Sequence, residues 1–471
     1  MADQVRSLVD LYGGAVRLDG DAVRIHDASK LQSAATDRVV WQAVFGNQAE
    51  KEAARWLLWE LGQATGARPA SINDLYLARG RGECGGFTVP AINVRAMAYD
   101  TARAVFRAAL AREAGAIILE IARSEIAYTD QRPAEYVAVM LGAALREGYR
   151  LPLFIQGDHC QVNAKKFAAD PEAEVGEVKK LIAEEIGAGF YNIDVDTSTL
   201  VDLSKPTLDE QQRANYERCA EITAFIREQE PEGVTVSVGG EIGEVGHKNS
   251  TVEELHAFMQ GYTRALRALG SQLGISKISV QTGTSHGGVV LPDGSIADVK
   301  LDLEALAALS RVAREEYGLA GAVQHGASTL PADAFGHFPR VETAEIHLAT
   351  NFQNIVFDHP RLPARLRSEI LEWLKVNAAG ERKPGDTEEQ FVYKARKKAI
   401  GPFKRELWSL PEDVRAAIAA ELEKTFGFLF DQLRVNGTAE LVRRFVRAPH
   451  QPHASLRPAL VAAEDDPEAG E

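Results

Sequence analysis

The chain has 471 residues, of which 45% are hydrophobic and 25% are charged, so it can form a large core and more than one domain. Its net charge of −14 argues against a nucleic-acid-binding protein, because phosphate contacts need a basic surface. No apolar run approaches the roughly 18–20 residues of a membrane span. Three scattered cysteines (Cys84, Cys160 and Cys219) without CxxC spacing indicate reduced thiols. We therefore expect a cytoplasmic protein that binds neither nucleic acid nor membranes.

Residues 1–80 are predicted to be mainly helical, with an amphipathic helix over Ala49–Gly62 that packs on the main domain. From about residue 85 to residue 360, short apolar runs alternate with helical patterns. The runs are Phe87–Ile92, Ala116–Ile121, Pro152–Ile155, Phe190–Val195, Val234–Val238, Ile278–Gln281, Gly321–Val323 and Ala344–Leu348. Eight such units predict a (β/α)8 barrel over residues 81–360, and an open doubly wound sheet is the alternative.

The remaining residues divide into two further regions. Residues 361–448 have a helical pattern with breaks at Pro384-Gly385 and Leu410-Pro411, so we expect a helical C-terminal region. Residues 449–471 are rich in proline and end in an acidic stretch, which is typical of a flexible tail.

Histidines follow three of the predicted strands. Gly157-Asp158-His159 follows the third run, His286 follows the sixth and His325 follows the seventh. The carboxyl ends of barrel strands meet at one face, where such folds carry their active sites. Three imidazoles from three strands, with one open coordination position, are typical of a catalytic Zn²⁺ site. The alternative is that one histidine caps a strand and the others are surface or core residues.

Carboxylates and glycines follow the same strands. Asp196 and Glu241 add acidic groups suited to a second or alternative metal position. Glycine and serine surround His286 and His325 and leave backbone N–H groups open to a ligand. Such turns after late barrel strands form phosphate sites, although tight turns also use glycine for purely structural reasons.

The barrel region resembles the class II, zinc-dependent ketose-bisphosphate aldolases, including the fructose- and tagatose-bisphosphate enzymes. The matching motifs are Pro90-Ala91-Ile92-Asn93, Gly157-Asp158-His159, Asp196-Thr197-Ser198, Glu241-Ile242-Gly243, Gly283-Thr284-Ser285-His286-Gly287 and His325-Gly326-Ala327-Ser328. The resemblance covers roughly residues 82–360 and is most specific from residue 278 to residue 331.

The resemblance implies a role for each motif residue. Zinc would be bound by His159, His286 and His325, with Glu241 and Asp196 at the alternative metal position. Asp158 is similar to the residue that exchanges a proton with the aldol hydroxyl. The implied substrate and phosphate contacts are Asn93, Gly287, Gly326, Ser328, His347 and Thr350.

Three features depart from the family pattern. His347 stands where the family usually has an asparagine. Asn249 stands where a mobile loop usually carries the glutamate that removes the C–H proton, and Glu244, Glu253 or Glu254 would have to replace it. The serine motif after the second strand is also missing. The sequence there, Glu120–Glu125, resembles the accessory subunits of tagatose-bisphosphate aldolases, which lack the His-Gly-Ala-Ser motif that this chain has.

We therefore expect a zinc-dependent lyase that cleaves or forms a ketose (bis)phosphate, giving dihydroxyacetone phosphate and an aldehyde. The alternatives are a non-catalytic accessory subunit and another metal-dependent sugar-phosphate enzyme, such as an isomerase or hydrolase, on the same barrel. We expect a homodimer or homotetramer. Cations for a distal phosphate could come from Lys394, Arg396, Lys397 or Lys398, unless these form a solvated helix face.

Overall fold

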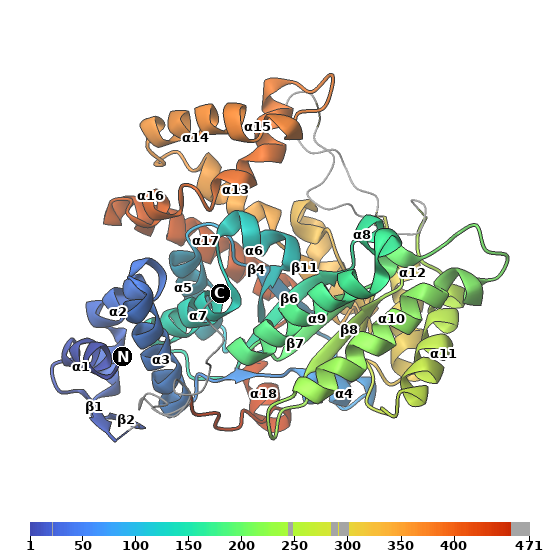
Figure 1. The fold of residues 1–471 in the computed structure, drawn as a ribbon, viewed down its shortest axis with the longest axis horizontal. Coiled ribbons are helices and arrows are strands. Elements are labelled where there is room, and N and C mark those ends of the chain that lie inside the picture. The colour runs from blue at the N-terminus through green and yellow to red at the C-terminus, as the bar shows by residue number, and fades with distance from the viewer. Residues whose placement is uncertain (21, 244–247, 284–290, 292–300, 454–471) are drawn as a thin grey trace, which may run out of the picture.

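The structure is a computed structural model that describes residues 1–20, 22–243, 248–283, 291 and 301–453 (Figure 1). A parallel sheet at its centre has the strand order β3-β6-β5-β4-β11-β10-β9-β8-β7, and β6 also pairs with β7. Within the described residues the barrel strands are β4 (Val89–Asn93), β5 (Ile118–Ala122), β6 (Leu153–Gln161), β7 (Asn192–Asp196), β8 (Ser237–Glu241), β9 (Lys277–Val280), β10 (Ala322–Gln324) and β11 (Glu345–Leu348). The β6–β7 pairing closes the barrel, so the predicted (β/α)8 fold is confirmed and the open-sheet alternative is wrong.

Helices surround the barrel, as expected for parallel strands joined by crossovers. They are α5 (Ala98–Leu110), α6 (Arg123–Thr129), α7 (Pro133–Glu147), α8 (Ala164–Ala169), α9 (Pro171–Ala188), α10 (Leu208–Gln229), α11 (Val252–Ala268), α12 (Leu303–Glu315) and α13 (Thr350–Asp358). Local sequence sets their ends. In α9, the Asp170 side chain accepts from the backbone N–H of Ala173, Pro171 occupies the first turn, and Gly189 ends the helix in the left-handed conformation.

The N-terminal region packs against the side of the barrel. It comprises α1 (Ala2–Asp10), β1 (Val16–Asp19), β2 (Ala22–Ile25), α2 (Ala34–Phe45), α3 (Gln48–Thr65), β3 (Pro69–Ala70) and α4 (Asn73–Gly80). The predicted amphipathic helix is α3, which begins with a capping box between Asn47 and Glu50. Both α2 and α3 contact α7 of the barrel. The antiparallel hairpin of β1 and β2 was not predicted.

The short strand β3 of this region extends the sheet at the amino ends of the barrel strands. β3 pairs in parallel with the start of β6 at Leu153 and Phe154. The side chain of Asn192, the first residue of β7, accepts from the backbone N–H of Ile72 and donates to the carbonyls of Ala70 and Ile155. β3 therefore fills the space where β6 and β7 have not yet begun to pair.

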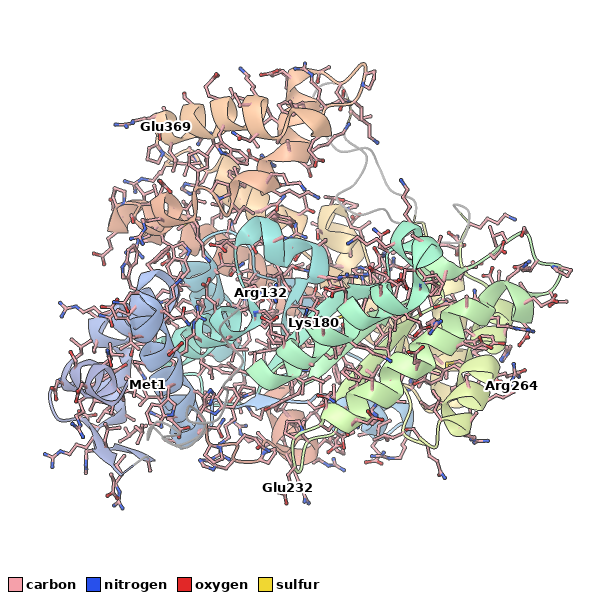
Figure 2. All side chains as sticks on the ribbon, viewed as in Figure 1. Met1, Arg132, Lys180, Glu232, Arg264 and Glu369 are labelled. Carbon is pink, nitrogen blue, oxygen red and sulfur yellow. The ribbon has the colours of Figure 1, made fainter. Side chains whose placement is uncertain are left out.

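The C-terminal region forms α14 (Ala364–Asn377), α15 (Glu388–Ala395), α16 (Lys404–Trp408), α17 (Glu412–Gln432) and α18 (Ala439–Phe445), as the helical pattern predicted. α17 packs along α5, while α14 and α15 lie beyond α13 at one end of the molecule (Figure 1). Charged residues such as Arg264 and Glu369 lie on the surface of the outer helices (Figure 2). No helix in the described part of the chain is long and apolar enough to cross a membrane.

Candidate active site

A β-bulge in β6 brings Asp158 and His159 into the same site. The register between β6 and β7 shifts between Gly157 and Cys160, and His159 adopts a positive φ of 44°. In a regular strand, adjacent side chains point to opposite faces. A bulge redirects one of them, and backbone strain of this kind is concentrated at functional sites. Both side chains therefore line the same cavity at the mouth of the barrel.

Two imidazoles and a carboxylate converge beside the bulge. His159, Glu241 and His325 offer ligand atoms that all lie within 4.8 Å of one another. The rings of His159 and His325 are 4.2 Å apart between centroids. Asp196 lies behind His159, with its Oδ2 atom 3.2 Å from Nδ1 of the ring. The structure thus brings together four of the five predicted metal residues, whereas His286 lies outside the described residues.

The chemistry of this group suits a divalent cation. Burial favours the neutral form of His159, but Asp158, Asp196 and Glu241 outweigh it and raise the pKa of the ring well above its ordinary value. Burial and Asp196 raise the pKa of Glu241 to about 8. The clustered carboxylates thus draw positive charge to this group, either as bound protons or as a metal ion that would displace them. Neutral imidazole nitrogens and carboxylate oxygens are common ligands of Zn²⁺.

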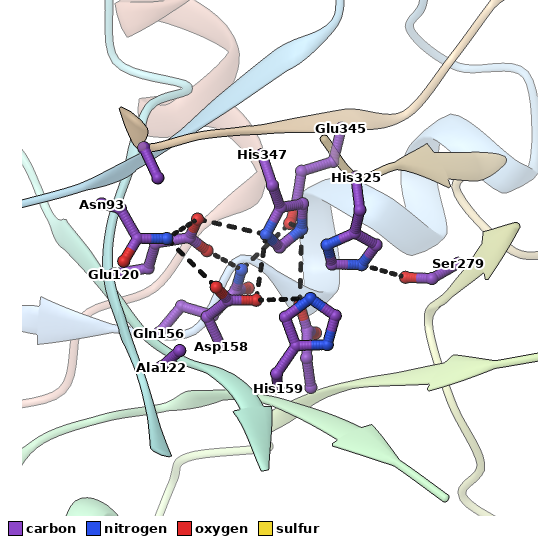
Figure 3. Close-up of polar contacts among 12 residues, drawn as sticks. Asn93, Glu120, Ala122, Gln156, Asp158, His159, Ser279, His325, Glu345 and His347 are labelled. Atoms are coloured by element: carbon purple, nitrogen blue, oxygen red, sulfur yellow. Dashed lines mark hydrogen bonds and ion pairs between the residues drawn. The ribbon is translucent and has the colours of Figure 1, made fainter. Parts of the chain in front are cut away.

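Asp158 is held from two sides (Figure 3). Nδ2 of Asn93 donates to its Oδ2 atom at 3.1 Å, and Nδ1 of His347 lies 3.2 Å from its Oδ1 atom. Burial opposes ionisation of Asp158, but His159 and His347 outweigh it and hold the pKa of the carboxyl well below its ordinary value. Asp158 is therefore ionised, which is the form that can accept a proton.

His347 lies between carboxylates on both of its nitrogens. Its Nδ1 atom also faces Oε1 of Glu120 at 3.1 Å, and its Nε2 atom lies 2.8 Å from Oε1 of Glu345. Burial would lower the pKa of His347, but Glu120 and Asp158 raise it well above its ordinary value. A cationic imidazole thus occupies the position where the family pattern has a neutral amide.

A buried ionic network continues below His347, and the sequence analysis did not identify it. Nζ of Lys277 lies 2.5 Å from Oε1 of Glu345, 2.9 Å from Oδ1 of Asp194 and 2.7 Å from Oε1 of Gln156. Gly239 makes room for it, since a Cβ there would lie 2.3 Å from Oδ1 of Asp194. Polar residues at alternate positions of short apolar strands are the signal that could have revealed this inward-facing layer.

The predicted phosphate residues gather where α13 begins. Gly326, which has a φ of 69°, Ser328 and Thr350 all line the cavity. The backbone N–H of Ala349 donates to Oγ of Ser328 at 2.5 Å, which joins the turn after β10 to the start of α13. A helix amino terminus with open N–H groups is suited to an anion. Gly287 lies outside the described residues.

A cavity of about 870 Å³ connects these groups, within the usual range for small-molecule sites. It is lined by Asn93, Asp158, His159, His325 and His347, and by residues of the C-terminal region. Asp196 and Glu241 line an adjacent pocket that shares His159 and His325 with this cavity. The arrangement combines a candidate metal group, a fixed carboxylate and a candidate anion turn.

The sequence model of the family described as fructose-bisphosphate aldolase class-II matches residues 81–404. The chain belongs to that family. The match confirms the resemblance seen in the motifs and extends beyond residue 360, where that resemblance ended, to include α14 and α15. Aldolases of this family generally use a divalent metal, in keeping with the histidine and carboxylate groups of the cavity.

Solved structures similar to this aldolase-family chain share little sequence identity with it. A probable tagatose 6-phosphate kinase from Sinorhizobium meliloti matches with a TM-score of 0.51 and 17% identity, over 78% of this chain and 95% of that one. A putative fructose-1,6-bisphosphate aldolase from Coccidioides immitis has a TM-score of 0.43 and 21% identity, over 78% and 96%. A fructose-bisphosphate aldolase from Campylobacter jejuni has a TM-score of 0.47 and 18% identity, over 79% and 97%. No curated protein matches the chain significantly.

Four C-terminal cations could bind a distal phosphate, and two of them line the cavity of this aldolase-family chain. They are Lys394, which forms an ion pair with Asp386 at 2.7 Å, and Lys397. Burial, Arg95 and Lys398 lower the pKa of Lys397. Among the described residues, Lys397 forms no ion pair with a carboxylate, so its charge remains available. Arg396 instead pairs with Asp358 at 2.6 Å and Lys398 with Glu381 at 3.4 Å, and neither lines the cavity.

Asn249 stands at the position of the family's loop glutamate, and its surroundings differ from those of the glutamates that could replace it. Nδ2 of Asn249 donates to Asp302 at 2.8 Å. Glu254 closes a capping box at the start of α11 by accepting from the backbone N–H of Thr251. Glu253 is exposed in the same helical turn, and Glu244 lies outside the described residues.

Proposed function

We propose that the chain catalyses the reversible, zinc-dependent aldol cleavage of a phosphorylated ketose to dihydroxyacetone phosphate and an aldehyde. The observation that carries this proposal is the position of the Asp158 carboxylate in one cavity with His159 and His325, which together with Glu241 form the candidate metal group. His286, which follows β9 in the sequence and lies outside the described residues, would complete the metal site. When bound, zinc supplies a Lewis acid that stabilises the negative charge developing on the substrate oxygens.

Asp158 would act on the C4 hydroxyl. When the C3–C4 bond breaks, C4 becomes the carbonyl carbon of the aldehyde and its hydroxyl proton passes to a carboxylate oxygen of Asp158. The electron pair of the broken bond remains on the three-carbon fragment as an enediolate, and C3 then gains a proton. A positioned acid–base group contributes roughly 10²–10⁴-fold to such a step. Asn93 and His347 fix the carboxylate in the direction of the cavity.

The phosphate turn and the C-terminal cations support a phosphorylated substrate. Gly326, Ser328 and Thr350 would bind the phosphate of the dihydroxyacetone end at the start of α13. Lys397, which also lines the cavity, would bind the other end of the ketose. Neither feature would be needed by an enzyme acting on a neutral sugar.

A non-catalytic accessory subunit is the second candidate, and the position of Asn249 favours it. An amide cannot remove a C–H proton near neutral pH, and Glu254 is already engaged in capping α11. The two candidates differ in one measurable step, the exchange of a dihydroxyacetone phosphate C–H with solvent.

Solvent exchange of deuterated dihydroxyacetone phosphate, followed by NMR with zinc-loaded protein, tests the proposal. We expect exchange well above that in buffer, and we expect Glu244→Gln or Glu253→Gln to abolish it while Glu254→Gln leaves it intact. Exchange no faster than in buffer, both alone and with added partner proteins, would instead identify the chain as an accessory subunit.

A further inference from the structure

Helix α4 lies outside the family-matched residues, yet it covers the end of the barrel opposite the cavity. The guanidinium of Arg79 donates to the carbonyls of Phe87, Ala320 and Thr343. These residues precede β4, β10 and β11, so α4 is fixed beneath the amino ends of three strands. The N-terminal region thus covers the end of the barrel at which the strands begin.

One side chain of α4 reaches the barrel interior. Tyr76 is fully buried, and its hydroxyl donates to Oε2 of Glu345, the first residue of β11. Burial and the neighbouring Glu345 carboxylate raise the pKa of Tyr76 well above its ordinary value. The phenol therefore stays protonated and acts as a hydrogen-bond donor.

Glu345 links this phenol to the active site. Its other oxygen, Oε1, lies 2.8 Å from Nε2 of His347 and 2.5 Å from Nζ of Lys277. On the far side of the ring, Nδ1 of His347 lies 3.2 Å from Oδ1 of Asp158. Three consecutive contacts therefore join Tyr76 to the carboxylate at the mouth of the barrel, and Figure 3 shows the part from Glu345 to Asp158.

The buried setting makes these contacts interdependent. Glu345 is fully buried and His347 is 5% exposed, so solvent cannot replace a lost partner. Without the Tyr76 hydroxyl, Oε2 of Glu345 would lack its donor in a closed interior, which is costly for a carboxylate. The carboxylate would turn toward Lys277 or Gln156, and the His347 ring that contacts it would move as well.

We propose that Tyr76 is a positioning residue, through which the N-terminal region sets the orientation of Asp158 by way of Glu345 and His347. This inference rests on the proposed function, because it assigns Asp158 the proton-transfer role. It gives the N-terminal region a part in activity although none of its described residues lines the cavity. A displacement of even about 1 Å in a reacting group can lower a rate substantially.

Tyr76→Phe tests the inference, since it removes one oxygen and keeps the ring. We expect kcat to fall on the order of 10-fold, with KM and zinc content unchanged. Tyr149→Phe is the matched control. Tyr149 is also buried, and its hydroxyl has no hydrogen-bond partner among the described residues, so this change should leave kcat unaltered. Equal kcat values for Tyr76→Phe and wild type would overturn the inference.

Two further measurements test the inference more closely. The first distinguishes positioning from general destabilisation, and the second does not depend on whether the chain is an enzyme. If Tyr76 acts through Glu345, Tyr76→Phe should add no further loss of kcat to Glu345→Gln, whereas independent effects would multiply. The imidazole ¹⁵N signals of His347, assigned with His347→Gln, should shift in Tyr76→Phe but not in Tyr149→Phe. That spectrum needs no turnover, so it tests the inference even if the chain is not an aldolase. Unshifted signals would refute the coupling of Tyr76 to His347.

Discussion

Glu185 packs directly against Gly157 beneath the β6 bulge, so that a Cβ atom on Gly157 would lie 2.5 Å from Oε2 of Glu185. Sγ of Cys160 donates to the same carboxyl oxygen at 3.3 Å. Burial raises the pKa of Glu185 to about 8. The bulge that carries Asp158 and His159 is thus supported by a carboxyl that stays largely protonated at neutral pH.

The raised pKa of Glu185 predicts a stability that falls with pH. The folded state keeps this proton up to about pH 8, whereas the unfolded chain loses it near pH 4.5. Between these values the folded state binds more protons, so its stability decreases as pH rises, by roughly 1 kcal/mol per pH unit. Urea unfolding at about pH 5, 6 and 7.5 should show a slope that is smaller in Glu185→Gln than in wild type by this amount, because Glu241, whose pKa is also raised to about 8, contributes equally in both. Glu184→Gln, at a neighbouring and more exposed position, should retain the slope.

Metal binding should depend on the histidines of the cavity. We expect His159→Ala and His325→Ala to lower zinc content, measured by mass spectrometry, and to abolish aldol cleavage, because each removes one donor of the converging group. His337→Ala removes an exposed histidine and should retain both properties. Full zinc content in both cavity variants would contradict this assignment.

Asp158→Asn should separate proton transfer from metal binding. The amide keeps the shape of the side chain but cannot accept the hydroxyl proton, so kcat should fall about 10²–10⁴-fold with zinc retained. If zinc is lost instead, and the rate recovers when the metal is restored, Asp158 supports the metal site and is not the proton acceptor.

Lys397 should contribute to the affinity for a phosphorylated ketose. Loss of a charged hydrogen bond costs about 1.5–3 kcal/mol, so Lys397→Met should raise KM by roughly 10-fold or more. Lys398→Met is the control, because Nζ of both lysines lies 5.8 Å from the Tyr128 ring centroid but only Lys397 lines the cavity. Equal KM values for the two variants would mean that Lys397 belongs to a solvated helix face.

The sequence predicted the barrel well because its strands are short apolar runs that end in polar residues. It predicted the gathering of His159, Glu241 and His325, since parallel strands align their carboxyl ends. It did not predict the buried network around Lys277, because this residue precedes the predicted apolar run Ile278–Gln281. Lys277 is the first residue of β9, at the end of the strand away from the predicted site.

Other features of the site had no local signal. The positive φ of His159 depends on the pairing of β6 with β7, which no single segment encodes. Tyr76 lies on a short helix whose target, Glu345, is far along the chain. β3 has two residues, too few to show a periodic pattern. Such contacts are tertiary, and the pattern within each segment carries no information about them.

The pairing of β3 with β6 also bears on how the barrel can be dissected. A fragment trimmed to the family-matched residues 81–404 would lack β3, and the first residues of β6 would then carry unsatisfied N–H and C=O groups. An open strand edge of this kind is a template for pairing with another chain. Such a fragment should therefore aggregate or exchange strands with a second copy, whereas a fragment that begins before Pro69 should stay monodisperse in the same buffer.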